Sequence, residues 1–478
     1  MARGRGPTVT PHLTILLIYA AALMALGVWI GRRVRHSADF FVAGRRLGPF
    51  LLFATLLAAN IGTGSTVGAA GLAYRDGLSV WWWVGSAGIG SLVLAFWVGP
   101  AVRRIAARHD LRTVGDYLEL RYGQPVRVTI AALFWIATLS ILAGQIVGMS
   151  RVLGAVTGLD FRAGCFVGGL VVTVYFAAGG LRTAAWVNVV QLVVLLAGFG
   201  LALPFGLAAA GGWGAITEAT GAVPGYWSFW EGGGSGWFYV VMLGPAFVVS
   251  PGLLQKIYGA RDDEAVRTGV GLNAAALLAF AIVPVLLGMM ARTAFPDLEA
   301  PEQALPTLLR DALPPLLGGI GLAALFSAEV SSADAILFML STSLSQDLYR
   351  RVLDPGASES RVLAVARGAA AAGGAAGIAL ALVFQTIIGA LSFFYTILTV
   401  SLFIPVLAGL YLRRVGMPEI LGSIAAGVSV VVVLQVARGG QGVGAFTPAM
   451  IGLAAALAGC LAVRGIWAAR RPKGASRP

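Results

Sequence analysis

Long apolar segments recur along the whole sequence and are separated by short polar stretches. A helix needs about 20 mainly apolar residues to cross the hydrocarbon core of a bilayer. Helices and closed barrels are the only structures that satisfy every backbone polar group there. We count thirteen such segments, at roughly 12–31, 49–72, 79–101, 128–154, 164–180, 184–209, 237–257, 269–292, 314–345, 363–384, 387–412, 418–437 and 446–468. The sequence therefore predicts an all-α polytopic membrane protein with thirteen transmembrane helices.

The residue composition agrees with a lipid environment. Hydrophobic residues make up 58% and charged residues 12% of the chain, which is unlike a soluble domain, and its 65 glycines suit close helix packing in lipid. The two cysteines, Cys165 and Cys460, lie in apolar segments, so the sequence supports neither a disulfide framework nor a zinc site. The net charge of +13 follows membrane topology, as the loops show, and we expect no nucleic-acid partner.

Basic residues gather in alternate loops. They are frequent in 32–46, 103–127, 256–267 and 350–367, whereas 210–236 and 293–309 contain none. Because cytoplasmic loops are enriched in Lys and Arg, this pattern predicts an outside N-terminus and a cytoplasmic C-terminus in the plasma membrane.

The segment 323–351 carries acids and hydroxyls inside an apolar helix. Glu329 and Asp334 would each cost at least ~2.5 kcal/mol in the membrane, so they mark a candidate functional site. At about 100° per residue, Ser331 and Ser332 share one face with Ala328, which leaves room for a small hard cation. For each serine alone, bonding back to its own helix is the favoured interpretation. The two acids make the cation site the better interpretation.

Two predicted spans are interrupted by residues that break helices. The second contains Gly and Ser at 62–65, and the seventh contains two prolines in 244–252. Irregular backbone at membrane depth must line a cavity or be buried in protein. The breaks are five spans apart, which predicts two inverted halves that each open with a broken helix around a binding site. The general frequency of Gly and Pro in membrane helices explains either break alone.

Several motifs resemble those of the sodium:solute symporter family. They are AANI at 58–61, GGL at 179–181, WVNVVQ at 186–191, LLQKIYGARD at 253–262, SSADAILFMLSTSLSQDLY at 331–349 and PVLAGLYLRR at 405–414. The resemblance implies a LeuT-type five-plus-five inverted repeat within one transporter domain. Its parts would be an extra N-terminal helix at 12–31, repeats at 49–209 and 237–412, and two C-terminal helices at 418–468.

The same resemblance implies where sodium binds. In the family, the main site takes carbonyl oxygens from the first broken helix and hydroxyls from the eighth core helix. The matching residues here are Ala58, Ile61, Ala328, Ser331 and Ser332.

A second cation site and a solute site are also implied. Many members carry an aspartate where this chain has Asn188, while Asp334 replaces a hydroxyl on the opposite wall. Asn188 and Asp334 are therefore candidates for a second cation site; otherwise a proton or a cationic solute must neutralise Asp334. The candidate solute-binding residues are Asn60, Thr63, Ser65, Gln145 and Ser250. Sugar transporters of the family carry an acid–amide pair where this chain has Gly64 and Ser65, which argues against a sugar.

These observations predict a sodium-coupled symporter, not an enzyme, that imports a small organic solute by alternating access. Sodium would be the coupling ion, and the solute and the lipid bilayer the other partners. A proton-coupled transporter that uses Glu329 or Asp334 is the alternative. A non-transporting membrane receptor is less consistent with the short tail. No basic residue is expected in the solute site, which argues mildly against a strongly anionic solute.

Overall fold

The computed structural model describes residues 11–31, 45–177, 181–232, 236–384, 386–412, 414–440 and 442–469. Across these residues the chain is helical, and β structure is limited to the isolated bridges Leu47–Ala260 and Val443–Phe446. Within the part of the chain that the structure describes, ten helical stretches are long and apolar enough to cross a membrane. Three shorter apolar helices occupy Pro11–Leu23, Pro49–Asn60 and Phe161–Val174. The predicted all-helical polytopic membrane protein is therefore confirmed.

The helices follow one another with short connections. The first half contains α1 (Pro11–Gly31), α3 (Pro49–Asn60), η2 (Thr63–Ser65), α4 (Val67–Asp76), η3 (Gly77–Val80), α5 (Trp81–Val93), η4 (Leu94–Val98), α6 (Gly99–Arg108), α7 (Val114–Tyr122), α8 (Gln124–Thr157), α9 (Phe161–Ala177), α10 (Leu181–Ala209) and α11 (Gly212–Thr220). The second half contains η5 (Gly236–Phe238), α12 (Tyr239–Val249), α13 (Pro251–Tyr258), α14 (Asp263–Phe280), α15 (Ile282–Ala294), η6 (Pro301–Gln303), α16 (Ala304–Thr307), η7 (Leu308–Ala312), α17 (Pro315–Thr342), η8 (Ser343–Leu353), α18 (Glu359–Phe384), α19 (Ile387–Tyr411), α20 (Met417–Arg438) and α21 (Pro448–Ala469).

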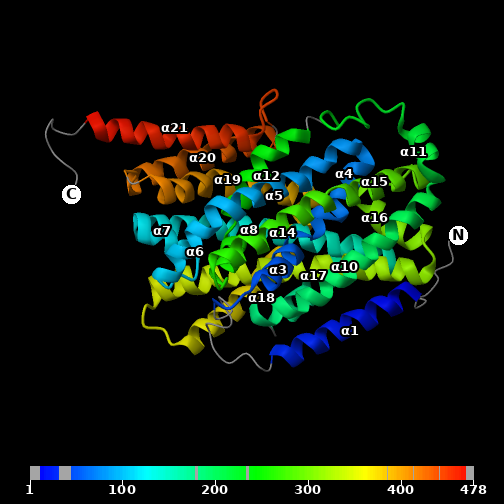
Figure 1. Ribbon diagram of the computed structural model, residues 1–478, viewed down its shortest axis with the longest axis horizontal. Coiled ribbons are helices and arrows are strands. Elements are labelled where there is room, and N and C mark those ends of the chain that lie inside the picture. Colours follow the sequence, from blue (N-terminus) through cyan, green and yellow to red (C-terminus); the bar gives the residue numbers. More distant parts are fainter. Residues whose placement is uncertain are drawn as a thin grey trace.

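The long helices run along one direction of an elongated bundle (Figure 1). α1 and α21 lie at opposite edges, and α6 and α7 lie at the other end of the bundle from α11 and α16. In the most apolar part of Pro315–Leu353, which contains α17, 89% of the residues are buried. The corresponding part of α21 has only 22% of its residues buried. α17 packs against α10, α8, α18, α3 and α1. The helix that carries the predicted cation site is thus the innermost one.

The first predicted break lies between α3 and α4. Ile61 leaves the helical region at φ −93° and ψ 90°, Gly62 is extended, and one short turn, η2, precedes α4. A Cβ added at Gly62 would lie 2.1 Å from the Ser332 hydroxyl oxygen, so only glycine allows this approach to α17.

The second break is narrower than the sequence predicts. Residues 244–249 remain helical in α12 even though Pro245 lies inside that helix. The chain leaves the helix at Ser250, with ψ 119°, and α13 begins at Pro251. Proline suits this first position because its missing N–H would have no helical partner there.

Candidate functional site

A central cavity lies where the two broken helices meet. The first break contributes Asn60, Gly62 and Ser65, and the second contributes Ser250 and Gly252. The other walls come from α5, α8, α14, α17 and α19. The cavity has a volume of about 80 Å³, counted as the space open to the centre of a water molecule. Since one water needs roughly 10–15 Å³ by this measure, the cavity has room for a small solute.

The break frees backbone carbonyls beside α17. Gly62 N–H donates to Ser65 Oγ (3.0 Å) and Thr63 N–H donates to Gln145 Oε1 (3.2 Å). In a continuous helix these two amides would bond to the carbonyls of Ala58 and Ala59. The two carbonyl oxygens are therefore available to other partners.

Two serines of α17 donate hydrogen bonds to those carbonyls. Ser331 Oγ donates to the carbonyl oxygens of Ala58 (2.8 Å) and Ala328 (3.2 Å). Ser332 Oγ donates to the carbonyl of the neighbouring residue, Ala59, at 3.2 Å. The structure thus gathers hard oxygen atoms from α3 and α17 at one point, the ligand type that a small cation prefers.

Ile61 is the fifth residue predicted for this site. The amide of Ser65, its expected helical partner, bonds to the Gly62 carbonyl at 3.0 Å instead. The Ile61 carbonyl is therefore released from the helical pattern.

Four of the five predicted solute residues line the cavity: Asn60, Ser65, Gln145 and Ser250. Asn60 Nδ2 donates to Asn273 Oδ1 (3.1 Å) on α14, a partner that the sequence did not indicate. Thr63 is fully buried and lies behind the cavity wall. Its hydroxyl contacts Gln145 and Glu329.

Lys256 corrects the expectation that no basic residue lies in the solute site. It lines the cavity from α13, is 4% exposed, and donates from Nζ to the Thr55 carbonyl (2.7 Å). Sequence analysis counted it with the basic residues of a loop. A lysine within an otherwise apolar span was the signal that could have identified it.

The aromatic residues divide into two groups. Trp83, Phe394 and Tyr395 line the cavity, and Trp83 Nε1 donates to the Gly64 carbonyl in the break (2.9 Å). Trp81 and Trp82 instead pack against the ring of Phe229 at centroid distances of 5.2 and 5.3 Å. One group forms a wall of the cavity, and the other packs away from it.

The comparison with known proteins identifies the family. Residues 40–427 match the model of the sodium:solute symporter family. The chain belongs to this family. The match includes both broken helices and α17, and it ends within α20.

Individual relatives are distant. The human sodium/iodide cotransporter is 25% identical over 353 residues, which is 68% of this chain and 53% of that protein. The sodium/pantothenate symporter of Escherichia coli strain K12 is 26% identical over 360 residues, or 70% of this chain and 72% of that protein. This chain thus spans about half the length of the first relative.

Solved structures share the fold. The structure is similar to a substrate-bound, outward-open Na⁺-coupled sialic acid symporter, with a TM-score of 0.79, 18% identity, and coverage of 95% of this chain and 97% of that chain. A nucleobase-cation-symport-1 family transporter with bromovinylhydantoin bound gives a TM-score of 0.63 at 15% identity, with coverage of 92% and 97%.

Asn188 and Asp334 are the two residues predicted for a second cation site. Asn188 belongs to α10, and its side chain lies outside the described residues. Asp334 on α17 is 8% exposed and interacts electrostatically with Lys256, without an ion-pair contact among the described side chains. Lys256 is therefore the nearby positive charge that the sequence did not reveal.

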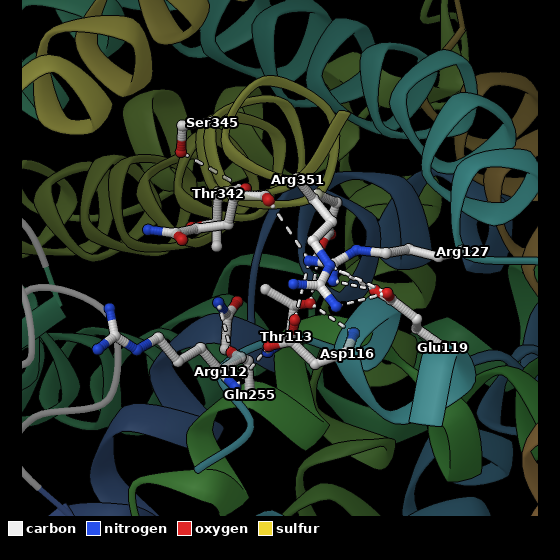
Figure 2. Close-up of polar contacts among 11 residues, drawn as sticks. Arg112, Thr113, Asp116, Glu119, Arg127, Gln255, Thr342, Ser345 and Arg351 are labelled. Carbon is white, nitrogen blue, oxygen red and sulfur yellow. Dashed lines mark hydrogen bonds and ion pairs between the residues drawn. The ribbon is translucent and has the colours of Figure 1, made fainter. Parts of the chain in front are cut away.

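A buried ion-pair network lies beyond the cavity, between α7, α8 and η8 (Figure 2). The Arg127 guanidinium contacts Asp116 (2.8 Å), Glu119 (2.6 Å) and Asp347 (2.7 Å). Burial alone would raise the pKa of Glu119, but hydrogen bonds from Arg351 and Arg127 outweigh it and hold this pKa below its ordinary value. Three carboxylates thus share one buried arginine at this end of the bundle.

Proposed function

We propose that this protein is a sodium-coupled symporter that moves a small organic solute by alternating access. The observation that carries the proposal is the meeting of the Ala58 carbonyl, freed by the break, with the Ser331 hydroxyl at 2.8 Å. A cation can bind among such oxygens when each hydroxyl turns its proton away. The proposed main sodium site comprises Ala58, Ile61, Ala328, Ser331 and Ser332.

The proposed topology has thirteen membrane spans, with inverted repeats at 49–209 and 237–412. The position of a break in the first span of each half supports this division. We place the N-terminus outside and the Arg127 network on the cytoplasmic side, because the loops at that end are rich in arginine.

For the solute, we propose a small molecule that carries a negative group. The Lys256 ammonium supports this choice because it lines the cavity and has one described hydrogen bond, to Thr55, although it has three donors. The names of the relatives, an iodide cotransporter and a pantothenate symporter, agree with it. Asn60, Ser65, Gln145 and Ser250 would supply the polar contacts.

We keep Asn188 and Asp334 as a proposed second cation position. Because Lys256 interacts electrostatically with Asp334, its ammonium would compete with a cation that binds there. Sodium and the Lys256 ammonium would thus share one carboxylate.

The test of the main site compares thermal unfolding in sodium and in potassium. A ligand at 100 times its Kd stabilises the folded state by about 2.7 kcal/mol. We expect Ser331→Ala combined with Ser332→Ala to abolish the sodium-dependent shift. Ser341→Ala is the matched control, because Ser341 lies on the same helix and its described hydrogen bond is to its own turn, at the Phe338 carbonyl (3.0 Å). An unchanged sodium shift in the double variant would refute the assignment.

The solute is tested by the same assay with small carboxylates and matched neutral analogues. We expect stabilisation by a carboxylate that requires sodium and is lost in Lys256→Met. Stabilisation by neutral analogues alone would exclude an anionic solute.

A further inference from the structure

The backbone of the first break fixes the direction of the Gln145 side-chain amide. The Thr63 N–H can only donate, and it bonds to one terminal atom of Gln145 at 3.2 Å. That atom must accept, so it is the amide oxygen, Oε1. The Thr63 hydroxyl lies 2.7 Å from the same oxygen. Since both contacts go to Oε1, the amide nitrogen Nε2 is the terminal atom that points away from Thr63.

The amide nitrogen of Gln145 opens to the central cavity. Gln145 is 4% exposed and lines that cavity from α8. Its Nε2 atom has no hydrogen-bond partner among the described residues, yet it is not one of the polar atoms that packing encloses completely. An amide nitrogen carries two N–H groups and accepts no hydrogen bond. This part of the cavity wall therefore presents donors only.

Lys256 is a second group in the cavity that can only donate. Its ammonium has three N–H groups, and one bonds to the Thr55 carbonyl at 2.7 Å. Thr55 and Thr63, which hold the two donor side chains, are eight residues apart. Eight residues correspond to about 12 Å in a continuous helix. A single carboxylate does not span such a distance, so the two donors contact different parts of a solute.

The other polar side chains of the cavity set no comparable requirement. The hydroxyl groups of Ser250 and Tyr395 can either donate or accept. Asn60 bonds to Asn273, and a bond between two amides is compatible with either orientation of both. Gln145 and Lys256 are thus the groups whose direction of hydrogen bonding is fixed.

Aromatic rings form much of the remaining wall. The ring centroids of Phe394, Phe247 and Trp83 lie 5.2, 5.7 and 6.3 Å from that of Tyr395. All four residues line the cavity. Binding apolar surface against such a wall removes it from water, which favours a solute with a hydrocarbon body.

We propose that the solute is a carboxylate with a hydrocarbon body and a second, neutral hydrogen-bond acceptor, such as a keto or amide carbonyl, that binds Gln145 Nε2. The placement of the carboxylate at Lys256 rests on the proposed function, whereas the donor character of Gln145 does not. A solute with only N–H groups at the second position would place donor against donor and leave both without a partner. Such a solute should be rejected.

The first experiment measures solute affinity by thermal unfolding of the purified protein in sodium. The probes are straight-chain carboxylates of increasing length that end in a methyl ketone. Each is paired with an isostere in which C=CH₂ replaces the keto C=O, so that shape and charge stay and the acceptor is lost. For at least one chain length, we expect the ketone to bind about two- to tenfold more tightly, as a neutral hydrogen bond allows. Equal affinities at every chain length would overturn the proposal.

The second experiment asks whether Gln145 is the source of this preference. Methionine has a similar length but no N–H group, so Gln145→Met should bind ketone and isostere equally. Gln303→Met is the matched control, because Gln303 lies on η6, outside the central cavity, and it should keep the preference. A preference that survives Gln145→Met would contradict the assignment. The comparison in wild type decides the solute class even if Gln145→Met does not fold.

Neutral carboxamides of the same probes separate this inference from the proposed function. If carboxylates give no shift but keto carboxamides bind more tightly than their isosteres, the anionic solute is refuted and the donor role of Gln145 is supported. If carboxylates bind and the ketones have no advantage, the anionic solute is supported and the second acceptor is refuted. No shift with any of these probes would overturn both.

Discussion

Replacing Arg127 by methionine should destabilise the protein far more than the same change at Arg351. Both guanidinium groups bond to Glu119, at 2.6 Å in each case. Their side chains differ in exposure, with 4% for Arg127 and 56% for Arg351. The two arginines therefore share one carboxylate partner at the same distance, but Arg127 is buried and also contacts Asp116 and Asp347.

The expected magnitudes follow from burial. Asp347, whose side chain is 7% exposed, would keep the Thr113 hydroxyl (2.6 Å) but lose its guanidinium partner in Arg127→Met. Removing one member of a buried ion pair costs about 3–5 kcal/mol, because the other charge stays in a low-dielectric site. An exposed pair contributes about 0–1 kcal/mol, so Arg351→Met should change stability little.

The assay is thermal unfolding of the purified variants in one detergent at low and high salt. Salt screens exposed pairs much more than buried ones, so only the Arg351 effect should shrink at high salt. Adding Asp347→Asn to Arg127→Met should restore part of the lost stability, because that carboxylate no longer needs a partner. Equal shifts for Arg127→Met and Arg351→Met would refute the reasoning.

Three further predictions concern the site and pH. Gly62→Ala should abolish sodium-dependent stabilisation because its Cβ would lie 2.1 Å from Ser332 Oγ, whereas Gly200→Ala, with no atom within 4 Å of its Cβ, should retain it. Lys256→Met should steepen the dependence of thermal stability on sodium concentration, because the Lys256 ammonium would no longer compete with sodium for the Asp334 carboxylate. An unchanged slope would argue against a second cation position. Burial raises the pKa of Glu302 above its ordinary value of 4.5, so wild type should lose stability relative to Glu302→Gln as pH rises from that value through the raised pKa, measured as the difference between their unfolding midpoints.

The sequence predicted the all-helical membrane architecture because a membrane span must be apolar for about 20 residues, and that pattern is local. The breaks were also predictable from local sequence, since Pro251 fixes its own φ and lacks an N–H donor, and Gly62 tolerates non-helical backbone wherever it occurs. The pairing of α3 with α17 came from the family resemblance, because hydroxyls and free carbonyls on separate helices do not identify one another by spacing.

What the sequence could not provide were contacts between distant segments. Lys256 follows an apolar run near the end of a predicted span, where a lysine usually faces the membrane surface. Its inward direction depends on the packing of α13 against α3. The bond from Asn60 to Asn273 likewise joins residues 213 positions apart, which no local pattern encodes. The contacts of the Thr63 hydroxyl with Gln145 and Glu329 also join distant segments, so the sequence could not show them.

The ends of the two broken helices are fastened to each other. Leu47, just before α3, accepts a hydrogen bond from Arg261 N–H (3.1 Å) and donates one to the Gly259 carbonyl (3.0 Å), just after α13. Lys256 adds a third bond, to Thr55 inside α3. Because of these three hydrogen bonds, a tilt of α13 should move α3 in the same direction. The breaks at Gly62 and Ser250 are the points where the two helices can bend, so a rearrangement at the cavity would move both helix ends at this side of the bundle together.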